Sequence, residues 1–90
     1  MDKVIITVVG KDTVGIIGKV CTYLADHKIN ILDISQTIVQ EYFNMMMIVD
    51  GSGANVSFDE MSSGLDEIGA GIGVNIKCQR EEIFTKMHRI

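Results

Sequence analysis

Residues 29–49 read INILDISQTIVQEYFNMMMIV, a stretch in which apolar and polar residues alternate on both sides of a short polar break. Such alternation predicts a β-hairpin, because successive side chains of a strand point to opposite faces of a sheet. We take Gln40 and Glu41 as a two-residue turn. One face of the hairpin is then almost wholly apolar. Its predicted cross-strand pairs are Ile38–Phe43, Gln36–Met45, Ile34–Met47 and Leu32–Val49.

The opposite face of this hairpin is mixed, and it still carries Tyr42, Met46 and Ile48. Gln-Glu is a poor pair for a type I′ turn, so a register shifted by one residue, which would exchange the two faces, stays open. Before Leu32 the apolar residues move to the other parity. A β-bulge at residues 30–32 would account for that shift.

The segment before the hairpin predicts a strand followed by a helix. Residues 3–10, KVIITVVG, are β-branched and nearly all apolar, which is typical of a central strand. Asp12 or Thr13 is the expected helix cap, and the helix should run to about Lys28. Its expected buried stripe is Val14, Ile17, Cys21 and Leu24.

The segment after the hairpin predicts a second helix and a last strand. Ser57 with Glu60 three residues later forms a capping-box signature, after the loop at residues 50–55. The glycines at positions 69, 71 and 73 should end the helix, and residues 74–79 alternate as a half-exposed strand. The expected stripe of this helix is Phe58, Met61, Leu65 and Ile68. A short C-terminal helix would align Ile83, Phe84, Met87 and Ile90.

The order of these elements predicts an α+β, ferredoxin-like βαββαβ fold with a four-stranded antiparallel sheet and two helices on one face, plus the short C-terminal helix. At 90 residues the chain should be a single domain spanning residues 1–90. Domains of this size have marginal stability, and the exposed sheet face keeps surplus apolar residues. Both points favour a homodimer.

Composition excludes several classes of partner. The net charge is −4 and the isoelectric point is near 4.9, which disfavours nucleic acids. The longest uncharged apolar run, at residues 42–49, is far too short to cross a membrane, and no secretory signal leads the chain. We therefore expect a cytoplasmic protein with no direct nucleic-acid or membrane partner.

No catalytic or metal-binding constellation emerges from the sequence. His27 and His88 should be helix-end surface residues, and Cys21 and Cys78 should be reduced core thiols. Residues 10–15 lack the lysine that a P-loop needs. We therefore expect no enzyme, no cofactor and no metal site. The turn amides before the first helix could receive a carboxylate, although glycines that merely permit a tight turn are the simpler interpretation.

Three segments together resemble a known family. They are GKDTVGIIGKV at residues 10–20, KINILDISQTI at 28–38 and EYFNMMMIVD at 41–50. The chain resembles the ACT domain, a small regulatory module that senses amino acids, and is similar to the stand-alone ACT proteins related to the glycine-cleavage-system repressor. The most specific parts are the D-x-x-G-I turn from Asp12 to Ile16 and the I-N-I opening of the next strand.

This resemblance implies a pocket at a dimer interface, lined by the first turn and the start of the second strand. The carboxylate of a free amino acid would meet helix-start amides near Thr13, Val14, Gly15 and Ile16. The side chains of Asp12 and Asn30 would meet its ammonium or polar groups, and Ile31 would line the pocket. Val14 stands where the family often has proline. Lys28 stands where it has glycine, so Lys28 needs a strained backbone or a different turn.

Two functions follow from the resemblance and the exposed surfaces. The first is a regulatory homodimer that binds an amino acid and acts on a partner protein in trans, since ACT modules usually work as attachments to other domains. The second is an interaction module without a small ligand, which would use the open sheet face and the C-terminal helix.

Overall fold

The structure is a computed structural model of the chain, and it describes residues 1–11 and 14–81. Four strands and two helices alternate in the order βαββαβ. Their bounds are β1 Lys3–Lys11, α1 Ile16–Asp26, β2 Asn30–Val39, β3 Tyr42–Asp50, α2 Phe58–Ile72 and β4 Val74–Arg80.

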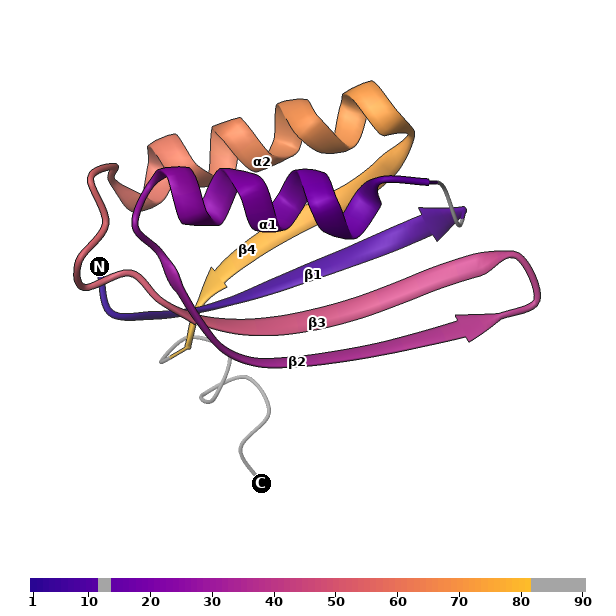
Figure 1. Cartoon of the computed structure of the whole chain (residues 1–90), viewed down its shortest axis with the longest axis horizontal. Coiled ribbons are helices and arrows are strands. Elements are labelled where there is room, and N and C mark those ends of the chain that lie inside the picture. The colour runs from indigo at the N-terminus through magenta and orange to yellow at the C-terminus, as the bar shows by residue number, and fades with distance from the viewer. Residues whose placement is uncertain (12–13, 82–90) are drawn as a thin grey trace.

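The four strands form one antiparallel sheet in the spatial order β2-β3-β1-β4. Both helices lie on the same face of this sheet, with α1 nearer to β2 and α2 behind it (Figure 1). The predicted ferredoxin-like fold is confirmed in its strand order, its antiparallel sheet and its two-helix layer. The predicted C-terminal helix lies outside the described residues, since only its first residue, Glu81, is included.

The hairpin register is confirmed over most of its length. Pairing runs from Val39–Tyr42 at the turn to Asp33–Ile48 in the predicted register. The register then shifts between Ile31 and Asp33, so a bulge lies where the change of parity predicted it. One predicted pair is wrong, because Val49 faces Ile31 rather than Leu32.

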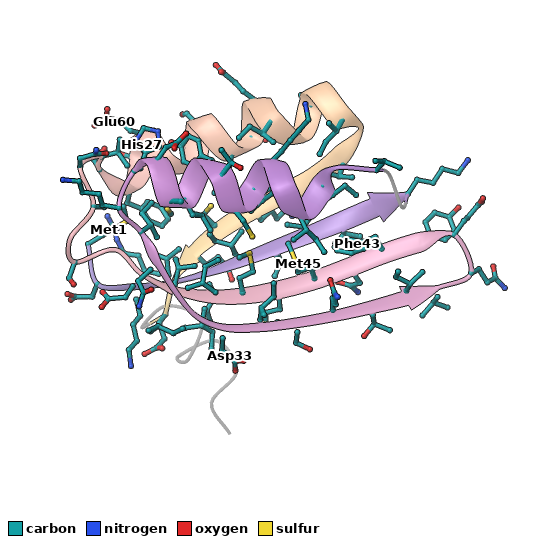
Figure 2. All side chains as sticks on the ribbon, in the orientation of Figure 1. Met1, His27, Asp33, Phe43, Met45 and Glu60 are labelled. Atoms are coloured by element: carbon teal, nitrogen blue, oxygen red, sulfur yellow. The ribbon has the colours of Figure 1, made fainter. Side chains whose placement is uncertain are left out.

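The core lies between the sheet and the two helices. Phe43 and Met45 point from β3 toward the helices, as Figure 2 shows. The core also takes the alternate residues of β1 and β4, together with one stripe from each helix. Its buried side chains are Val4, Ile6, Val8, Ile16, Val20, Leu24, Ile29, Phe43, Met45, Met47, Val49, Met61, Leu65, Val74 and Ile76.

The buried stripe of α1 differs from the prediction. Leu24 is buried as expected, but it is joined by Ile16 and Val20, whereas Val14 is 98% exposed and Ile17 is 37% exposed. The helix begins at Ile16, so Val14 lies in the preceding turn and is on no helix face. Cys21, predicted on the stripe, is only half-buried against the core.

The predicted start of α1 is also wrong, and its end lies two residues before the predicted end at about Lys28. The N-cap is Gly15, with a left-handed φ of 91°, rather than Asp12 or Thr13, which lie outside the described residues. The helix ends at Asp26 and His27 is its C-cap. Lys28 follows in the left-handed region at φ 59°, so it adopts the strained backbone expected of a residue standing in a glycine's place.

The predicted ends of α2 are confirmed. The Ser57 hydroxyl accepts a hydrogen bond from the Glu60 amide, and the Glu60 carboxylate accepts one from the Ser57 amide, which completes the capping box. Gly73 ends the helix with a left-handed φ of 79°. Met61 and Leu65 of the predicted stripe are buried, while Phe58 and Ile68 are half-buried against the core.

The apolar face of the hairpin is covered only on its β3 half. Phe43, Met45 and Met47 are buried under the helices, but their neighbours on β2 are not. Ile34 remains 43% exposed and Ile38 remains 56% exposed. The reason is geometrical, since β2 is an edge strand and no described strand lies beyond it.

Candidate functional site

The first part of the expected site is the turn between β1 and α1. Gly15 takes a left-handed backbone conformation here, and its carbonyl accepts the first helical hydrogen bond from the Lys19 amide at 2.9 Å. The amides that open a helix have no carbonyl partner within the helix. Val14 and Gly15 are exposed, whereas Ile16 is buried in the core. Asp12 and Thr13 lie outside the described residues.

The charged side chains at this end of the sheet interact only weakly. Lys11 closes β1, and its Nζ lies 4.0 Å from Oε2 of Glu41 in the hairpin turn. Both side chains are well exposed, so the ion pair contributes little to stability. The positive end of the α1 dipole is the stronger fixed attraction for an anion at this turn.

The second part of the expected site is the start of β2. Asn30 is exposed and pairs with Asp50 of β3, while Ile31 is half-buried against the core. The entry to the strand is fixed by the buried Ile29, whose amide donates to the Leu24 carbonyl at 2.9 Å. The position of Asn30 therefore depends on the end of α1.

The two parts of the site lie at opposite ends of α1. Figure 1 shows the start of α1 beside the hairpin-turn end of the sheet and the start of β2 at the other end. The 11 residues of α1 span about 16 Å at 1.5 Å per residue. One chain therefore does not bring Val14, Gly15 and Ile16 together with Asn30 and Ile31.

An exposed apolar edge runs between these two parts. Ile34 and Ile38 lie on the helix side of β2, and Ile17 is exposed on α1. The outer edge of β2 has no neighbouring strand within the described sheet, so its backbone groups are open to pairing. This edge and its apolar side chains form the surface that joins the turn to the start of β2.

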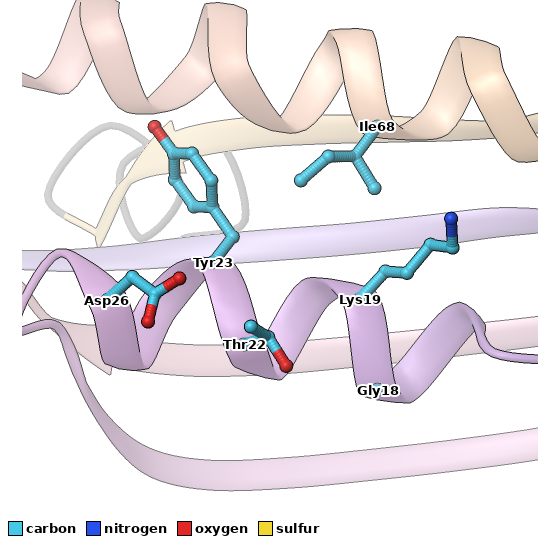
Figure 3. A pocket seen from close by; sticks show the side chains of 6 residues that line it. All are labelled: Gly18, Lys19, Thr22, Tyr23, Asp26 and Ile68. Atoms are coloured by element: carbon cyan, nitrogen blue, oxygen red, sulfur yellow. The ribbon is translucent and has the colours of Figure 1, made fainter.

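Three hollows of the described surface lie away from the expected residues. Figure 3 shows a groove of about 390 Å³ between the helices, where Tyr23, Lys19 and Ile68 face one another. A polar cleft of about 600 Å³ lies at the N-terminus, with Lys3, Asp50 and Arg80 among its lining residues. The third, of about 380 Å³, lies beside Cys78. None of the three is lined by Val14, Gly15, Ile16, Asn30 or Ile31.

A polar cluster that the sequence did not reveal joins the helices near the α1 C-cap. His27 Nδ1 donates to Asn55 Oδ1 at 2.9 Å, and the rings of His27 and Tyr23 are in contact at an interplanar angle of 49°, with centroids 4.3 Å apart. The Tyr23 hydroxyl donates to the Glu60 carbonyl at 3.3 Å. Burial raises the Tyr23 pKa. These contacts give His27 a structural role in joining α1 to the loop before α2. Residues so far apart in the chain left no local signal.

Two further titratable groups have shifted pKa values, and neither shift favours a reactive nucleophile. Burial raises the pKa of the Cys78 thiol to about 11, which disfavours the nucleophilic thiolate. The Ser52 amide donates to the Asp50 carboxylate and holds the pKa of that group low. Within residues 1–11 and 14–81, no three His, Cys, Asp or Glu side chains cluster so as to hold a metal ion. The same ranges contain no helix long and apolar enough to cross a bilayer.

Comparison with known proteins now gives the family. The family model described as "ACT domain" matches residues 2–79. A UPF0237 protein of Bifidobacterium longum is 66% identical over 90 residues, which is 100% of both chains. Another from Clostridium acetobutylicum is 59% identical over 88 residues, covering 98% of this chain and 99% of its own.

Solved structures agree with this result. An ACT domain protein from Streptococcus pneumoniae is 40% identical and superposes with a TM-score of 0.80, covering 92% of this chain and 93% of its own. The regulatory subunit of aspartate kinase from Thermus thermophilus, 25% identical with a TM-score of 0.67, covers 87% of this chain and 50% of its own. ACT domains are typically regulatory modules that bind small molecules, and the curated relatives are not named as enzymes. The chain belongs to the ACT domain family.

Proposed function

We propose that the protein is a regulatory module that binds a free amino acid, or a similar small carboxylate, at the interface of a homodimer and passes the signal to a partner protein. One observation carries this proposal: the two parts of the expected site lie at opposite ends of α1, with an exposed apolar strand edge between them. A second copy of the chain can complete such a site.

Twofold pairing of two β2 edges gives the required arrangement. In an antiparallel pair, the start of one β2 lies beside the end of the other. The end of β2 is on the same side of the molecule as the β1–α1 turn (Figure 1). Asn30 of the second copy would then come close to Val14, Gly15 and Ile16 of the first. Symmetry would create two equivalent sites in each dimer.

The chemistry of the two parts suits an amino acid. First-turn amides and the helix dipole attract a carboxylate, and the left-handed Gly15 leaves the backbone uncovered by a side chain. The Asn30 amide can both donate and accept, so it can bind an ammonium or a polar side chain of the ligand. Asp12 would add a negative charge for the ammonium group.

Calorimetric titration with each common amino acid tests this proposal. Asn30→Ala should weaken binding by about tenfold or more, because a polar partner of the ligand is lost. Asn75→Ala is the matched control, since Asn75 is equally exposed but lies on β4, at the far edge of the sheet. The absence of heat with every amino acid at millimolar concentration would refute ligand binding, and equal loss from both variants would refute the placement of the site.

A second candidate is an interaction module without a small ligand. It is favoured by the apolar side chains on the sheet face opposite the helices, where Val9 is 48%, Tyr42 is 56% and Met46 is 40% exposed. Deleting residues 81–90 separates the two functions. The interaction module requires that partner binding is lost on deletion, whereas the sensor tolerates the deletion and keeps its amino-acid binding, provided that the dimer persists.

A further inference from the structure

The helix layer carries the excess negative charge of the chain. α1 and α2 together contain five carboxylates and one lysine, Lys19, so their net charge is −4. The whole chain also has a net charge of −4, so the residues outside the two helices balance one another. The five carboxylates belong to Asp26, Asp59, Glu60, Asp66 and Glu67. A positively charged partner is therefore attracted to this layer.

Helix capping explains only part of this charge. Asp59 and Glu60 lie in the first turn of α2, where the helix dipole stabilises a carboxylate. Asp26 lies in the last turn of α1, where the dipole disfavours one, and no basic residue accompanies it there. Neither Asp26 nor Glu67 forms an ion pair with any residue in the ranges 1–11 and 14–81. Contacts within the described chain therefore do not account for the charges at positions 26 and 67.

These two carboxylates lie near one end of the groove between α1 and α2. Asp26 lines the groove at the same end as Tyr23, whereas Lys19 lies toward the other end (Figure 3). The Tyr23 hydroxyl donates to the Glu60 carbonyl at 3.3 Å. Burial raises the Tyr23 pKa, and the negative charges of Glu60 and Glu67 add to this rise because both lie near the hydroxyl. Three carboxylates therefore border the Tyr23 end of the groove.

The groove also contains apolar surface and a glycine that the fold does not need. Ile68 of α2 and the Tyr23 ring line it, and both are half-buried. Gly64 of α2 is required, because a Cβ there would collide with the Tyr23 ring. Gly18 of α1 is not, because a Cβ there would meet no described atom within 4 Å, and glycine disfavours a helix relative to alanine. An exposed glycine lining a groove suits the close approach of another molecule.

We propose that this groove binds a basic segment of a partner protein, with one apolar side chain against Tyr23 and Ile68 and with lysines or arginines beside Asp26 and Glu67. The groove measures about 390 Å³, whereas about 150 Å³ is enough to hold a benzene-sized group. A side chain as large as leucine therefore fits. A second copy of this chain is a poorer occupant, because its helix layer carries the same negative charge.

This surface is separate from the proposed amino-acid site. Successive residues of a helix are about 100° apart, so Lys19 and Tyr23 face α2 while Ile17 and Cys21 face the opposite side of α1. Pairing through the β2 edge leaves the groove open, and each dimer would present two grooves. The inference goes beyond the proposed function, because a basic segment can bind here with or without an amino acid.

Titration of the full-length protein with a short lysine-rich peptide that carries one central leucine tests the proposal. We expect the largest changes in amide chemical shift at Gly18, Thr22 and Ile68. Replacing the leucine of the peptide with serine should weaken binding by about tenfold or more, because the apolar contact is lost. Unchanged spectra at millimolar peptide, changes centred on another surface, or equal affinity of the two peptides would each overturn the proposal.

Charge reversal at neighbouring residues of α2 separates local from general electrostatics. Glu67→Lys should weaken binding of the leucine peptide by about threefold or more, because a carboxylate that borders the groove becomes a positive charge. Asp66→Lys is the matched control, with the same change in net charge on the side of α2 that faces β4, where Asp66 lies beside Cys78. Its effect should be clearly smaller. Equal weakening by both variants would show that net charge alone acts and would overturn the groove.

Two variants should weaken binding without weakening the fold. Gly18→Leu fills the groove and favours the helix, and Asp26→Lys replaces a charge that the α1 dipole disfavours. We expect each variant to keep or raise the melting temperature while the leucine peptide binds about fivefold more weakly or worse. Wild-type affinity in both folded variants would overturn the proposal, whatever the outcome of the amino-acid titrations.

Discussion

Replacing Ile38 with lysine tests the strand-edge dimer most directly. Ile38 is 56% exposed on the helix side of β2, and Ile34 beside it is 43% exposed. Together they offer about one isoleucine side chain of uncovered surface per protomer. Full burial of such a side chain contributes about 1.5–3 kcal/mol, so a twofold interface would gain about 3–6 kcal/mol from these residues in the two protomers.

The expected loss of dimer stability follows from the contribution of Ile38 to the buried apolar surface. Ile38→Lys removes the burial of a half-exposed side chain from both protomers, or about 2–3 kcal/mol, which raises the dimer dissociation constant by about 30- to 150-fold. Two like charges brought together across the symmetry axis add to this loss. The free energy of unfolding of the protomer should change by no more than about 1 kcal/mol, because position 38 is largely exposed and lies on an edge strand.

Sedimentation velocity over a range of protein concentrations measures this change. Met46→Lys is the matched control, because Met46 is 40% exposed on the opposite face of the sheet and should leave the dimer intact. Thermal unfolding of both variants checks that the protomer remains folded. A wild-type protein that is monomeric at micromolar concentration, or a dimer that dissociates in Met46→Lys but not in Ile38→Lys, would refute the β2 interface.

Three further predictions concern stability. Ser57→Ala should cost about 1 kcal/mol in urea unfolding because α2 loses its cap, whereas Ser63→Ala within the helix should stay within about 0.5 kcal/mol; equal effects would contradict the role of the cap. Lys28→Gly should stabilise the protein by up to about 1 kcal/mol, since φ is 59° at this residue, and a lower melting temperature would contradict this. The free energy of unfolding should fall as pH rises from about 9 to about 11, because the folded state keeps the Cys78 thiol protonated while the unfolded state ionises. Cys78→Ala should reduce this dependence of the unfolding free energy on pH. An unchanged dependence in the variant would contradict the role of Cys78.

The hairpin was predictable because two independent signals agree there. Alternation fixes which residues share a face, and the turn at Gln40 and Glu41 fixes the register. The structure keeps this register even though Gln40 has a positive φ of 57°, which is unusual for glutamine. The change of parity before Leu32 was enough to locate the bulge. The capping box of α2 was equally local, so its boundary was also predictable.

The phase of α1 was not predictable because its sequence contains two overlapping apolar stripes. Val14, Ile17 and Cys21 have helical spacing, and so do Ile16 and Val20. The start of the helix decides between them, and that start depends on the left-handed conformation of Gly15. A residue type permits this conformation but does not require it, so the sequence alone could not select the stripe.

The candidate site raises the same difficulty at a larger scale. Sequence motifs name Gly15 and Asn30, but they do not reveal that the length of α1, about 16 Å, separates the two parts of the site within one chain. The partly uncovered β2 edge and the divided site belong to one arrangement, since the helices leave Ile34 and Ile38 of that edge exposed between the two parts of the site. A ligand that needs both parts would bind tightly only when two chains are paired. Ligand binding and dimerisation should then be thermodynamically linked, so that adding ligand strengthens the dimer by the same factor as pairing strengthens ligand binding.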